Sequence, residues 1–501
     1  MSLTQLKTRA QLGIHAPEVR VEVHISNGLP AFTVVGLPET AVREARDRVR
    51  SAILNSGFEF PTRRITVNLA PADLPKEGGR YDLPIALGIL AASEQIEASG
   101  LTDIVCFGEL ALGGECCRIE GLLPALIASK KARQAAIIPC QNRTEGALLR
   151  DLSIQLATSL SEICSSLNGG KALPLLDPGL PPHTPDPTMD LTEVYGQYRA
   201  KRALEIAAAG GHHMLMMGPP GTGKSMLAQR MNSILPLMNE DEAMSSASIR
   251  SVCQLPVNPD NWLKRPFQSP HHTASGIALV GGGRNPRPGE ISLAHNGVLF
   301  LDELAEFNRA AIEVLREPLE TGRIHISRAS GKAVFPAQFQ LIAAMNPCPG
   351  GCDSIKVCDC SPQQLSRYRN KLSAPLLDRI DIQIELGRLE HQQLIIEKEK
   401  ATETSSEVRQ RVCNARKLQL ARQGCVNARL GHRDLDEICG LSRKLEQTLI
   451  NGIEKLRLST RSYHKLLKLA RTIADLAATG TINEAHIAEA ISYRRQDRRQ
   501  A

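Results

Sequence analysis

The sequence predicts an α/β multidomain protein with a mixed α+β domain at the amino terminus, a parallel α/β core and a helical carboxy-terminal domain. Three observations predict this organisation. The chain has 501 residues, which is too long for one ordinary hydrophobic core. The stretch GGKALPLLDPGLPPHTPDPTMD holds six prolines and is typical of an extended linker. After it, short apolar strands alternate with helical patterns until about residue 390. We therefore expect domains at 1–170, 191–389 and 390–501, with a linker at 171–190.

Composition and charge set few limits on the partners of this chain. Hydrophobic residues make up 42% and charged residues 23%, and the net charge of +7 permits a polyanionic partner without requiring one. The amino terminus lacks the apolar segment of a secretory signal, and the most apolar stretches are far too short to span a bilayer. We expect a cytoplasmic protein with no membrane partner, whose 13 cysteines are mostly reduced.

The core begins with a pattern typical of a phosphate-binding loop. The stretch HHMLMMG predicts a buried strand that enters a glycine-rich turn, and an amphipathic helix follows. In this pattern the backbone N–H groups surround phosphate oxygens, the lysine reaches the terminal phosphates and the last hydroxyl binds Mg²⁺. The sequence therefore predicts that ATP and Mg²⁺ bind at Gly218, Pro219, Pro220, Gly221, Thr222, Gly223, Lys224 and Ser225.

The second predicted strand of the core, NGVLFLDE, ends in two acids. Asp302 is placed to hold Mg²⁺ through its water shell, together with Ser225, and Glu303 to orient and deprotonate the attacking water. Two acids at a strand end are also common as a solvated edge. Downstream of a phosphate loop, nucleotide hydrolysis is the better interpretation.

Together these residues resemble the AAA+ ATPases, and three further positions match that family. Asn346, in AAMNP, matches the sensor-1 asparagine that helps to position water. Arg379, in SAPLLDRIDI, matches the arginine finger of the magnesium-chelatase-like branch, which reaches into the site of a neighbouring subunit. Arg461 matches the sensor-2 arginine, which would touch the γ-phosphate. The resemblance implies a homo-hexameric ring, and the alternative for both arginines is surface solvation or an ion pair between helices.

Two basic segments indicate which ligand such a ring would bind. RIHISR and KAVFPAQF flank a Ser-Gly turn, which is the pattern of a β-hairpin with Arg328 and Lys332 at its tip. The segment ALVGGGRNPRPGEISLAHNG adds a flexible insertion with Arg284 and Arg287. In the AAA+ branch of magnesium chelatases and replicative helicases, these correspond to the pre-sensor-1 hairpin and the helix-2 insert, which face the pore. Such tips would hold single-stranded or branched DNA without reading its sequence, and solvated hairpin ends are the alternative.

The amino-terminal domain resembles the proteolytic domain of Lon. The resemblance rests on NLAPADLPKEGGRYDLPIALGILAA and FGELALGGECCRIEGLLPALIASKKARQAAIIP. Lon works with a serine–lysine dyad, and the match places Arg80 at the serine and Leu123 at the lysine. Neither side chain can take part in an activated hydroxyl–amine pair. We therefore expect a Lon-like domain without peptidase chemistry.

The whole arrangement of a Lon-like domain, a linker, an AAA+ core and a helical lid domain resembles the ComM/YifB family. Its most specific stretches are GEISLAHNGVLFLDELAEF and LSAPLLDRIDI. The resemblance implies an ATP-driven DNA translocase that promotes branch migration in natural transformation, with recombination proteins as further partners. Two other functions remain open. One is the ATPase subunit of magnesium chelatase, which lacks a Lon-like domain. The other is a protein-remodelling scaffold, for which an aromatic-hydrophobic pore loop is missing.

Four cysteines lie within thirteen residues in NPCPGGCDSIKVCDCSP. Four thiolates are suited to tetrahedral Zn²⁺. The spacing is irregular, with three residues inside the first pair and one inside the second. The sequence leaves two interpretations open, a set of reduced free thiols or a Zn²⁺ site made of Cys348, Cys352, Cys358 and Cys360.

Overall fold

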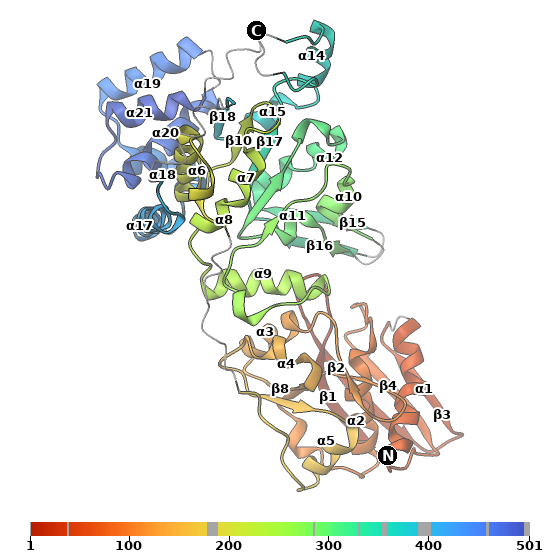
Figure 1. Ribbon diagram of the computed structural model, residues 1–501. Coiled ribbons are helices and arrows are strands. Elements are labelled where there is room, and N and C mark those ends of the chain that lie inside the picture. Colours follow the sequence, from red (N-terminus) through yellow and green to blue (C-terminus); the bar gives the residue numbers. More distant parts are fainter. Residues whose placement is uncertain are drawn as a thin grey trace. The chain divides into compact units, whose positions relative to one another are not determined.

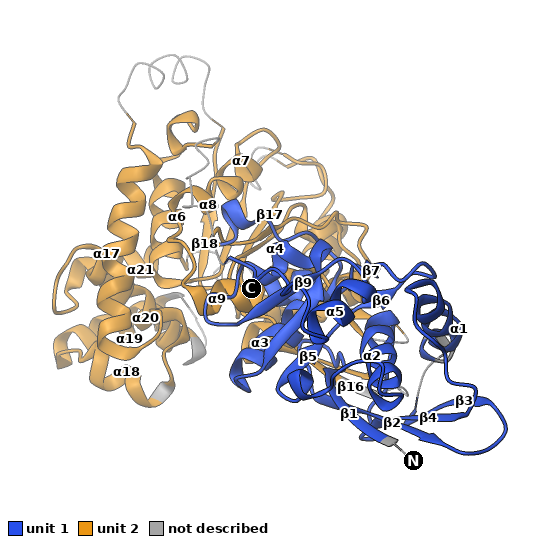
Figure 2. Cartoon of the chain, turned by 90° about the horizontal axis from the view of Figure 1, so that it is seen from below, with its two compact units in different colours: residues 1–184, 247–262 blue, residues 185–246, 263–501 orange. Residues whose placement is uncertain are grey.

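The structure is a computed structural model that describes residues 2–37, 40–177, 189–283, 286–328, 331–352, 358–388, 402–456 and 460–494. The chain forms two compact units, shown in blue and orange in Figure 2. Unit 1 contains residues 1–184 and 247–262, and unit 2 contains residues 185–246 and 263–501. Each unit has its own hydrophobic core. The segment 247–262 packs with the amino-terminal part of the chain, although residues of unit 2 flank it in the sequence.

Unit 1 is a mixed α/β structure. Its elements are β1 (Ser2–Arg9), β2 (Glu18–Ser26), β3 (Ala31–Val35), α1 (Thr40–Asn55), β4 (Arg64–Ala70), η1 (Gly79–Tyr81), α2 (Asp82–Ala92), η2 (Ser99–Leu101), β5 (Ile104–Cys106), β6 (Glu109–Leu110), β7 (Cys116–Cys117), α3 (Leu123–Lys131), β8 (Ala135–Pro139), η3 (Cys140–Asn142), α4 (Arg143–Gly146), β9 (Ile154–Ala157), α5 (Leu160–Leu167), the second half of α9 (Glu240–Val252) and η5 (Pro259–Asn261).

A seven-stranded sheet with the order β3-β4-β2-β1-β5-β8-β9 forms the centre of unit 1. The pairs β1–β2 and β2–β4 are antiparallel, and the other pairs are parallel. Strand β2 alternates between buried and less buried residues, as expected for a strand with one face on the core. Helix α2 packs against β1 and β2 and is buried along its whole length, which explains why its sequence is apolar on every side.

Unit 2 contains the α/β core and the carboxy-terminal helices. Its elements are η4 (Leu191–Glu193), α6 (Tyr198–Gly210), β10 (Met214–Met217), α7 (Lys224–Gln229), α8 (Met231–Ile234), the first half of α9, β11 (Phe267–Gln268), α10 (Gly276–Val280), β12 (Gly281–Gly282), β13 (Arg287–Pro288), α11 (Glu290–Leu293), β14 (Val298–Leu301), η6 (Leu304–Glu306), α12 (Arg309–Glu313), α13 (Arg316–Thr321), β15 (Arg323–Arg328), β16 (Gly331–Pro336), β17 (Gln340–Met345), α14 (Pro362–Arg369), α15 (Ala374–Leu377), β18 (Ile382–Glu385), α17 (Ser405–Gln423), η7 (Asn427–Arg429), α18 (His432–Cys439), α19 (Arg443–Leu456), α20 (Thr460–Leu476) and α21 (Glu484–Ser492).

The core sheet of unit 2 has the order β11-β14-β17-β10-β18, and every pair in it is parallel. The three strands predicted at HHMLMMG, NGVLFLDE and FQLIAAMNP are confirmed as β10, β14 and β17. These strands are short and almost entirely buried, as expected where helices cover both faces of a parallel sheet. In open parallel sheets ligands bind at the carboxyl ends of the strands, so this edge is where a site is expected.

Helices make up the described part of the chain after Ser405, apart from turns (Figure 1). Helix α17 begins with a capping box between Thr404 and Glu407 and ends at Gly424 in the left-handed conformation. Helices α17 and α20 both pack against α6 of the core. A two-point ion pair between Arg422 and Asp475, at 2.8 and 3.0 Å, joins α17 to α20. None of the described helices combines the length and the apolar character needed to cross a membrane.

The β-hairpin predicted before the third core strand is confirmed. Strands β15 and β16 pair antiparallel, from Arg323 opposite Pro336 to Arg328 opposite Gly331. Residues 329–330 and the side chains of Arg328 and Lys332, which were predicted to contact DNA, lie outside the described part of the chain.

The second basic insertion forms a short two-stranded ribbon. Strands β12 and β13 pair antiparallel, with Gly282 opposite Arg287. The side chain of Arg287 is exposed at this ribbon, and Arg284 lies outside the described residues.

Candidate nucleotide site

The predicted phosphate loop joins β10 to α7 at the carboxyl end of a central strand. Gly221 and Gly223 have φ values of +80° and +87°, a backbone conformation that side chains with a Cβ atom rarely adopt. Gly218 is required for a different reason, because a Cβ atom there would lie 2.6 Å from the carbonyl oxygen of Leu386. Helix α7 starts at Lys224, and the first N–H groups of a helix have no partner within it. This loop is therefore shaped to receive phosphate oxygens.

Lys224 is held in place inside this loop. Its Nζ donates to the carbonyl oxygens of Gly218 at 2.6 Å and Pro219 at 2.9 Å, and to Oδ1 of Asn346 at 3.2 Å. Burial lowers the pKa of Lys224. Phosphate oxygens are stronger acceptors than carbonyl oxygens, so the ammonium group is positioned to exchange these contacts for a phosphate.

Ser225 and Asp302 form the oxygen pair expected for Mg²⁺. Ser225 Oγ donates to Oδ2 of Asp302 at 2.6 Å, although the residues come from α7 and from the end of β14. The second carboxylate oxygen of Asp302 accepts the backbone N–H of Glu303 at 2.9 Å, which fixes the orientation of the carboxylate. Oxygen ligands next to a phosphate loop are those that Mg²⁺ prefers, so the donor set fits this ion.

Glu303 has a backbone conformation that is uncommon for a residue with a side chain. Its φ is +51°, and such strain is concentrated at functional sites. Oε2 of its carboxylate lies 3.1 Å from Nδ1 of His272. The ring of His271 lies against that of His272, with centroids 4.1 Å apart. The sequence does not reveal this pair of histidines, because nothing in the local pattern SPHHTASG links it to an acid about thirty residues later.

Asn346 follows β17, the strand next to β10, so it lies beside the phosphate loop. The hydroxyl of Tyr368, on α14, donates to the backbone carbonyl of Asn346 at 3.2 Å. Gln197 also contacts the loop, since its Nε2 donates to the carbonyl oxygens of Thr222 at 3.4 Å and Gly387 at 2.9 Å. Neither Tyr368 nor Gln197 was predicted. For Gln197 a positive φ of +50° is a structural sign of its special position, and sequence alone does not reveal it.

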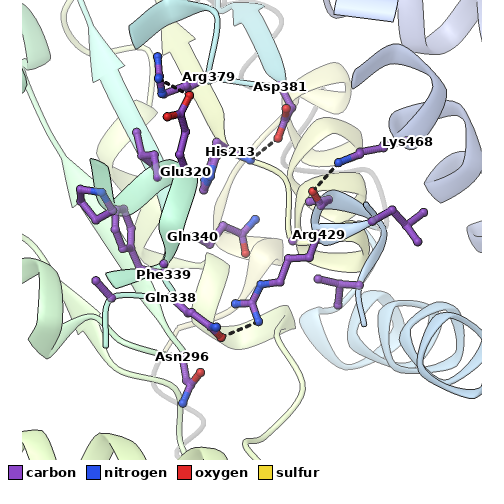
Figure 3. A pocket seen from close by; sticks show the side chains of 18 of the residues that line it. His213, Asn296, Glu320, Gln338, Phe339, Gln340, Arg379, Asp381, Arg429 and Lys468 are labelled. Atoms are coloured by element: carbon purple, nitrogen blue, oxygen red, sulfur yellow. Dashed lines mark hydrogen bonds and ion pairs between the residues drawn. The ribbon is translucent and has the colours of Figure 1, made fainter. Parts of the chain in front are cut away.

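Arg379 lies at the opposite end of the core sheet from Lys224. It precedes β18, whose first residue, Ile382, is paired with Met214 at the amino end of β10. The phosphate loop follows the other end of this four-residue strand, which spans about 10 Å. The guanidinium of Arg379 forms an ion pair with Glu320 (Figure 3). The structure therefore does not bring Arg379 to the phosphate loop of its own chain.

A cavity of about 590 Å³ lies at this amino-terminal end of the strands (Figure 3). Lys465 on α20 contributes to its wall and forms an ion pair with Asp381 at 3.0 Å. Burial alone would raise the pKa of Asp381, but Lys465 and His212 more than offset it, and the pKa stays well below its usual range. Basic side chains outnumber acidic ones in the lining, where the basic ones are Arg265, Arg379, Arg416, Arg429, Lys465 and Lys468 and the acidic ones are Glu242, Glu320, Asp378 and Asp381.

The predicted sensor-2 residue belongs to the same end of the sheet. Arg461 is on α20, one turn before Lys465. The side chain of Arg461 lies outside the described residues. Both predicted arginines thus come from elements at the end of the sheet opposite Lys224.

The four cysteines for which the sequence leaves free thiols or a Zn²⁺ site open come together in the structure. The Sγ atoms of Cys348, Cys352, Cys358 and Cys360 all lie within 4.8 Å of one another. We call them the four-cysteine cluster. It begins two residues after Asn346 and therefore adjoins the nucleotide site.

In unit 1, the two positions matched to the Lon dyad are occupied by buried side chains. One guanidinium nitrogen of Arg80 donates to Oε1 of Gln11 at 2.7 Å and to the carbonyl oxygen of Glu120 at 2.8 Å. Leu123 is fully buried in the core of the unit. Neither position offers a hydroxyl nucleophile or an amine base.

Comparisons with known proteins identify the family of this chain. Residues 190–394 match the family "Magnesium chelatase, subunit ChlI", residues 21–142 match "Subunit ChlI of Mg-chelatase", and residues 402–494 match "Magnesium chelatase, subunit ChlI C-terminal". The chain is 50% identical over 498 residues to Competence protein ComM of Haemophilus influenzae, which covers 99% of this chain and 98% of that protein. It is 49% identical over 504 residues to YifB of Salmonella typhimurium and 48% identical over 510 residues to YifB of Escherichia coli, each covering 99% of this chain and 98% of the relative. The chain therefore belongs to the ComM/YifB family of magnesium-chelatase-like AAA+ proteins.

Proposed function

We propose that this chain hydrolyses ATP in a hexameric ring of identical copies and uses the energy to move DNA, promoting branch migration of recombination intermediates during natural transformation. The strongest support is that the predicted catalytic residues lie at two opposite ends of the core sheet. Lys224, Ser225, Asp302, Glu303 and Asn346 meet at the carboxyl ends of the core strands. Arg379 lies at the other end of the same sheet. A site completed by a second copy would explain both positions.

Each residue of the site has a chemical role in this proposal. Lys224 and the loop N–H groups hold the phosphates, and Ser225 and Asp302 orient Mg²⁺, which neutralises charge on the phosphate oxygens. Glu303 accepts a proton from the attacking water, and His272 fixes the carboxylate in place. Asn346 donates from its amide to that water while its oxygen stays near Lys224.

The arginines act in trans in this proposal. Arg379 of one copy approaches the phosphates bound by its neighbour and stabilises negative charge in the transition state. Because α20 meets the core near Asp381, at the same end as Arg379, we assign Arg461 to the neighbour's site as well. Head-to-tail contacts of this kind close into rings, and six copies is the ring size that the AAA+ resemblance implies.

In this proposal the substrate that the ring moves is DNA. Hairpin β15–β16 and ribbon β12–β13 carry Arg328, Lys332, Arg284 and Arg287, which would hold phosphates without reading bases. The 50% identical relative is named a competence protein, which favours a role in DNA uptake and recombination, in the cytoplasm and with recombination proteins as partners. The Lon-like amino-terminal domain has no peptidase activity in this proposal, because Arg80 and Leu123 stand at the positions of the dyad.

A second function, the ATPase subunit of magnesium chelatase, is favoured by the descriptions of the three matching families. It predicts that a porphyrin-binding partner subunit, and not DNA, stimulates ATP hydrolysis. A protein-remodelling scaffold predicts stimulation by unfolded protein instead.

The discriminating experiment offers a four-way DNA junction, with ATP, to the wild-type protein and to Lys224→Ala and Glu303→Gln. We expect the wild-type protein to resolve the junction and both variants to fail, while added casein stays intact. Lys130→Ala is a suitable control, since Lys130 is on α3 of unit 1 and pairs only with Asp151 among the contacts described. Junction processing by the Glu303→Gln variant at the wild-type rate would contradict the motor proposal.

A further inference from the structure

The four-cysteine cluster is compact enough for one metal ion. Zn–S bonds of about 2.3 Å in a tetrahedron place sulfur atoms about 3.8 Å apart, and the Sγ atoms here all lie within 4.8 Å of one another. A cubane iron–sulfur core is larger, and its four thiolates stand further apart. None of these cysteines forms a disulfide, since all thirteen cysteines of the chain are free. The geometry thus favours a single tetrahedral ion.

The backbone around the cluster supplies donors that stabilise thiolates. The N–H of Cys352 donates to Sγ of Cys348 at 3.2 Å. The N–H groups of Gly350 and Cys360 point in the same way at Sγ of Cys360 and Cys358, respectively. Four thiolates around a divalent cation keep a net charge of about −2, and N–H···S hydrogen bonds offset that charge. Three such donors would stabilise protonated, uncharged thiols much less than thiolates.

The position of the cluster connects it to the nucleotide site through three contacts. Asn346 lies two residues before Cys348 and contacts Lys224. A Cβ atom on Gly351, inside the first cysteine pair, would lie 3.1 Å from the ring of Pro220 in the phosphate loop. On the other side, α14 begins just after Cys360 and places Tyr368 on the carbonyl of Asn346.

We propose that Cys348, Cys352, Cys358 and Cys360 bind one Zn²⁺ ion, which braces Asn346 and the phosphate loop against α14. The segment 347–361 has almost no regular secondary structure among its described residues, and a metal cross-link between its two ends would hold Asn346 in position. The bracing role rests on the proposed nucleotide site, whereas the metal site does not.

The first test measures metal on the wild-type protein, purified without added zinc or chelator. We expect about one zinc per chain by elemental analysis, released when an organomercurial reagent titrates the thiols. Protein in which zinc is replaced by Co²⁺ should show the intense visible absorption of tetrahedral thiolate coordination. Zinc far below one per chain, with all four thiols freely reactive in the native protein, would overturn the proposal.

The second test uses the double variant Cys358→Ser, Cys360→Ser and the control Cys140→Ser, which removes the exposed cysteine of unit 1. We expect the double variant to lose its zinc and to bind a fluorescent ATP analogue about tenfold more weakly, and the control to keep both properties. Full zinc in the double variant would overturn the metal site. Lost zinc with unchanged nucleotide affinity would overturn the bracing role. If the double variant does not fold, the metal content of the wild-type protein still decides the first question. Zinc-free wild-type protein that still processes junctions would leave the proposed function standing and the zinc proposal refuted.

Discussion

Oδ1 of Asn346 lies 3.2 Å from Nζ of Lys224, although 122 positions separate the two residues in the chain. They meet because β10 and β17 are parallel neighbours, with Met217 opposite Met345, so that both residues follow the same edge of the sheet. The amide that would sense the terminal phosphate is therefore in contact with the lysine that would bind it.

Substitution of Asn346 should separate nucleotide binding from hydrolysis. We expect Asn346→Ala to bind ATP with nearly wild-type affinity and to hydrolyse it about 10²-fold more slowly, because the amide would act mainly in the transition state. Lys224→Ala should lose binding itself. Equilibrium binding of a fluorescent ATP analogue and steady-state phosphate release distinguish the two. Equal loss of binding in both variants would show that Asn346 acts as part of the phosphate cradle only.

His272 should support catalysis through Glu303. Removing the imidazole in His272→Ala frees the carboxylate of Glu303, with which it pairs at 3.1 Å. We expect kcat to fall about tenfold with KM unchanged, and His272→Gln, which keeps a donor, to recover part of that loss. Glu303→Gln should abolish turnover and still bind ATP. A His272→Ala variant with normal kcat and a raised KM would assign the histidine to nucleotide binding.

The Lys465–Asp381 pair should stabilise the contact between α20 and the core. Lys465→Met leaves the nearly buried carboxylate without its main counter-charge, and we expect about 1–3 kcal/mol of lost stability, measured by thermal unfolding at pH 7. The pKa of Asp381 lies well below its usual range, so its stabilising effect is present above the unfolded value of about 4 and is lost as the pH falls further. Lys465→Met should raise that pKa, so the variant should unfold at a higher pH than the wild type on acidification. The exposed pair of Lys130 and Asp151 gives a control, since Lys130→Met should change stability by less than about 1 kcal/mol.

The basic hairpin tip should determine DNA affinity. Changing Arg328 and Lys332 together to Ala removes two positive charges, and we expect weaker binding to every DNA sequence and a salt dependence reduced by about two phosphate contacts. The matched control changes Lys130 and Lys131 of α3, two charges in the other unit. Fluorescence anisotropy at a series of salt concentrations measures both. An unchanged salt slope in the Arg328, Lys332 variant would exclude the hairpin from the DNA contact.

Much of the site was predictable because its signals are local. The spacing from Gly218 to Ser225 determines a loop by itself, and Asp302, Glu303 and Asn346 each follow a short apolar run that predicts a buried strand. Once the strands are assigned, their parallel pairing places these residues at the same edge of the sheet. A local pattern, two alternating segments around a Ser-Gly turn, also predicted the hairpin β15–β16.

What escaped prediction depends on contacts between distant segments. His272 contacts Glu303, and Gln197 contacts the phosphate loop. Both contacts depend on how segments far apart in the sequence pack together, and residue spacing does not reveal them. Helix α9 has a continuous helical pattern, so nothing in the sequence marks the point after which residues 247–262 pack with unit 1. The side of the sheet on which Arg379 lies became clear only from the register of β18 with β10.

The most direct test of the central proposal, an ATP site shared between two copies, mixes two inactive variants. Lys224→Ala retains Arg379 but lacks the phosphate-binding lysine, and Arg379→Ala retains the lysine but lacks the arginine. In an equimolar mixed ring, about a quarter of the sites join an intact loop from one copy to an intact arginine from its neighbour. We predict that DNA-stimulated ATP hydrolysis reappears on mixing, at up to about a quarter of the wild-type rate. Activity that stays at the sum of the two separate variants, in mixtures shown to contain mixed rings, would contradict the shared site.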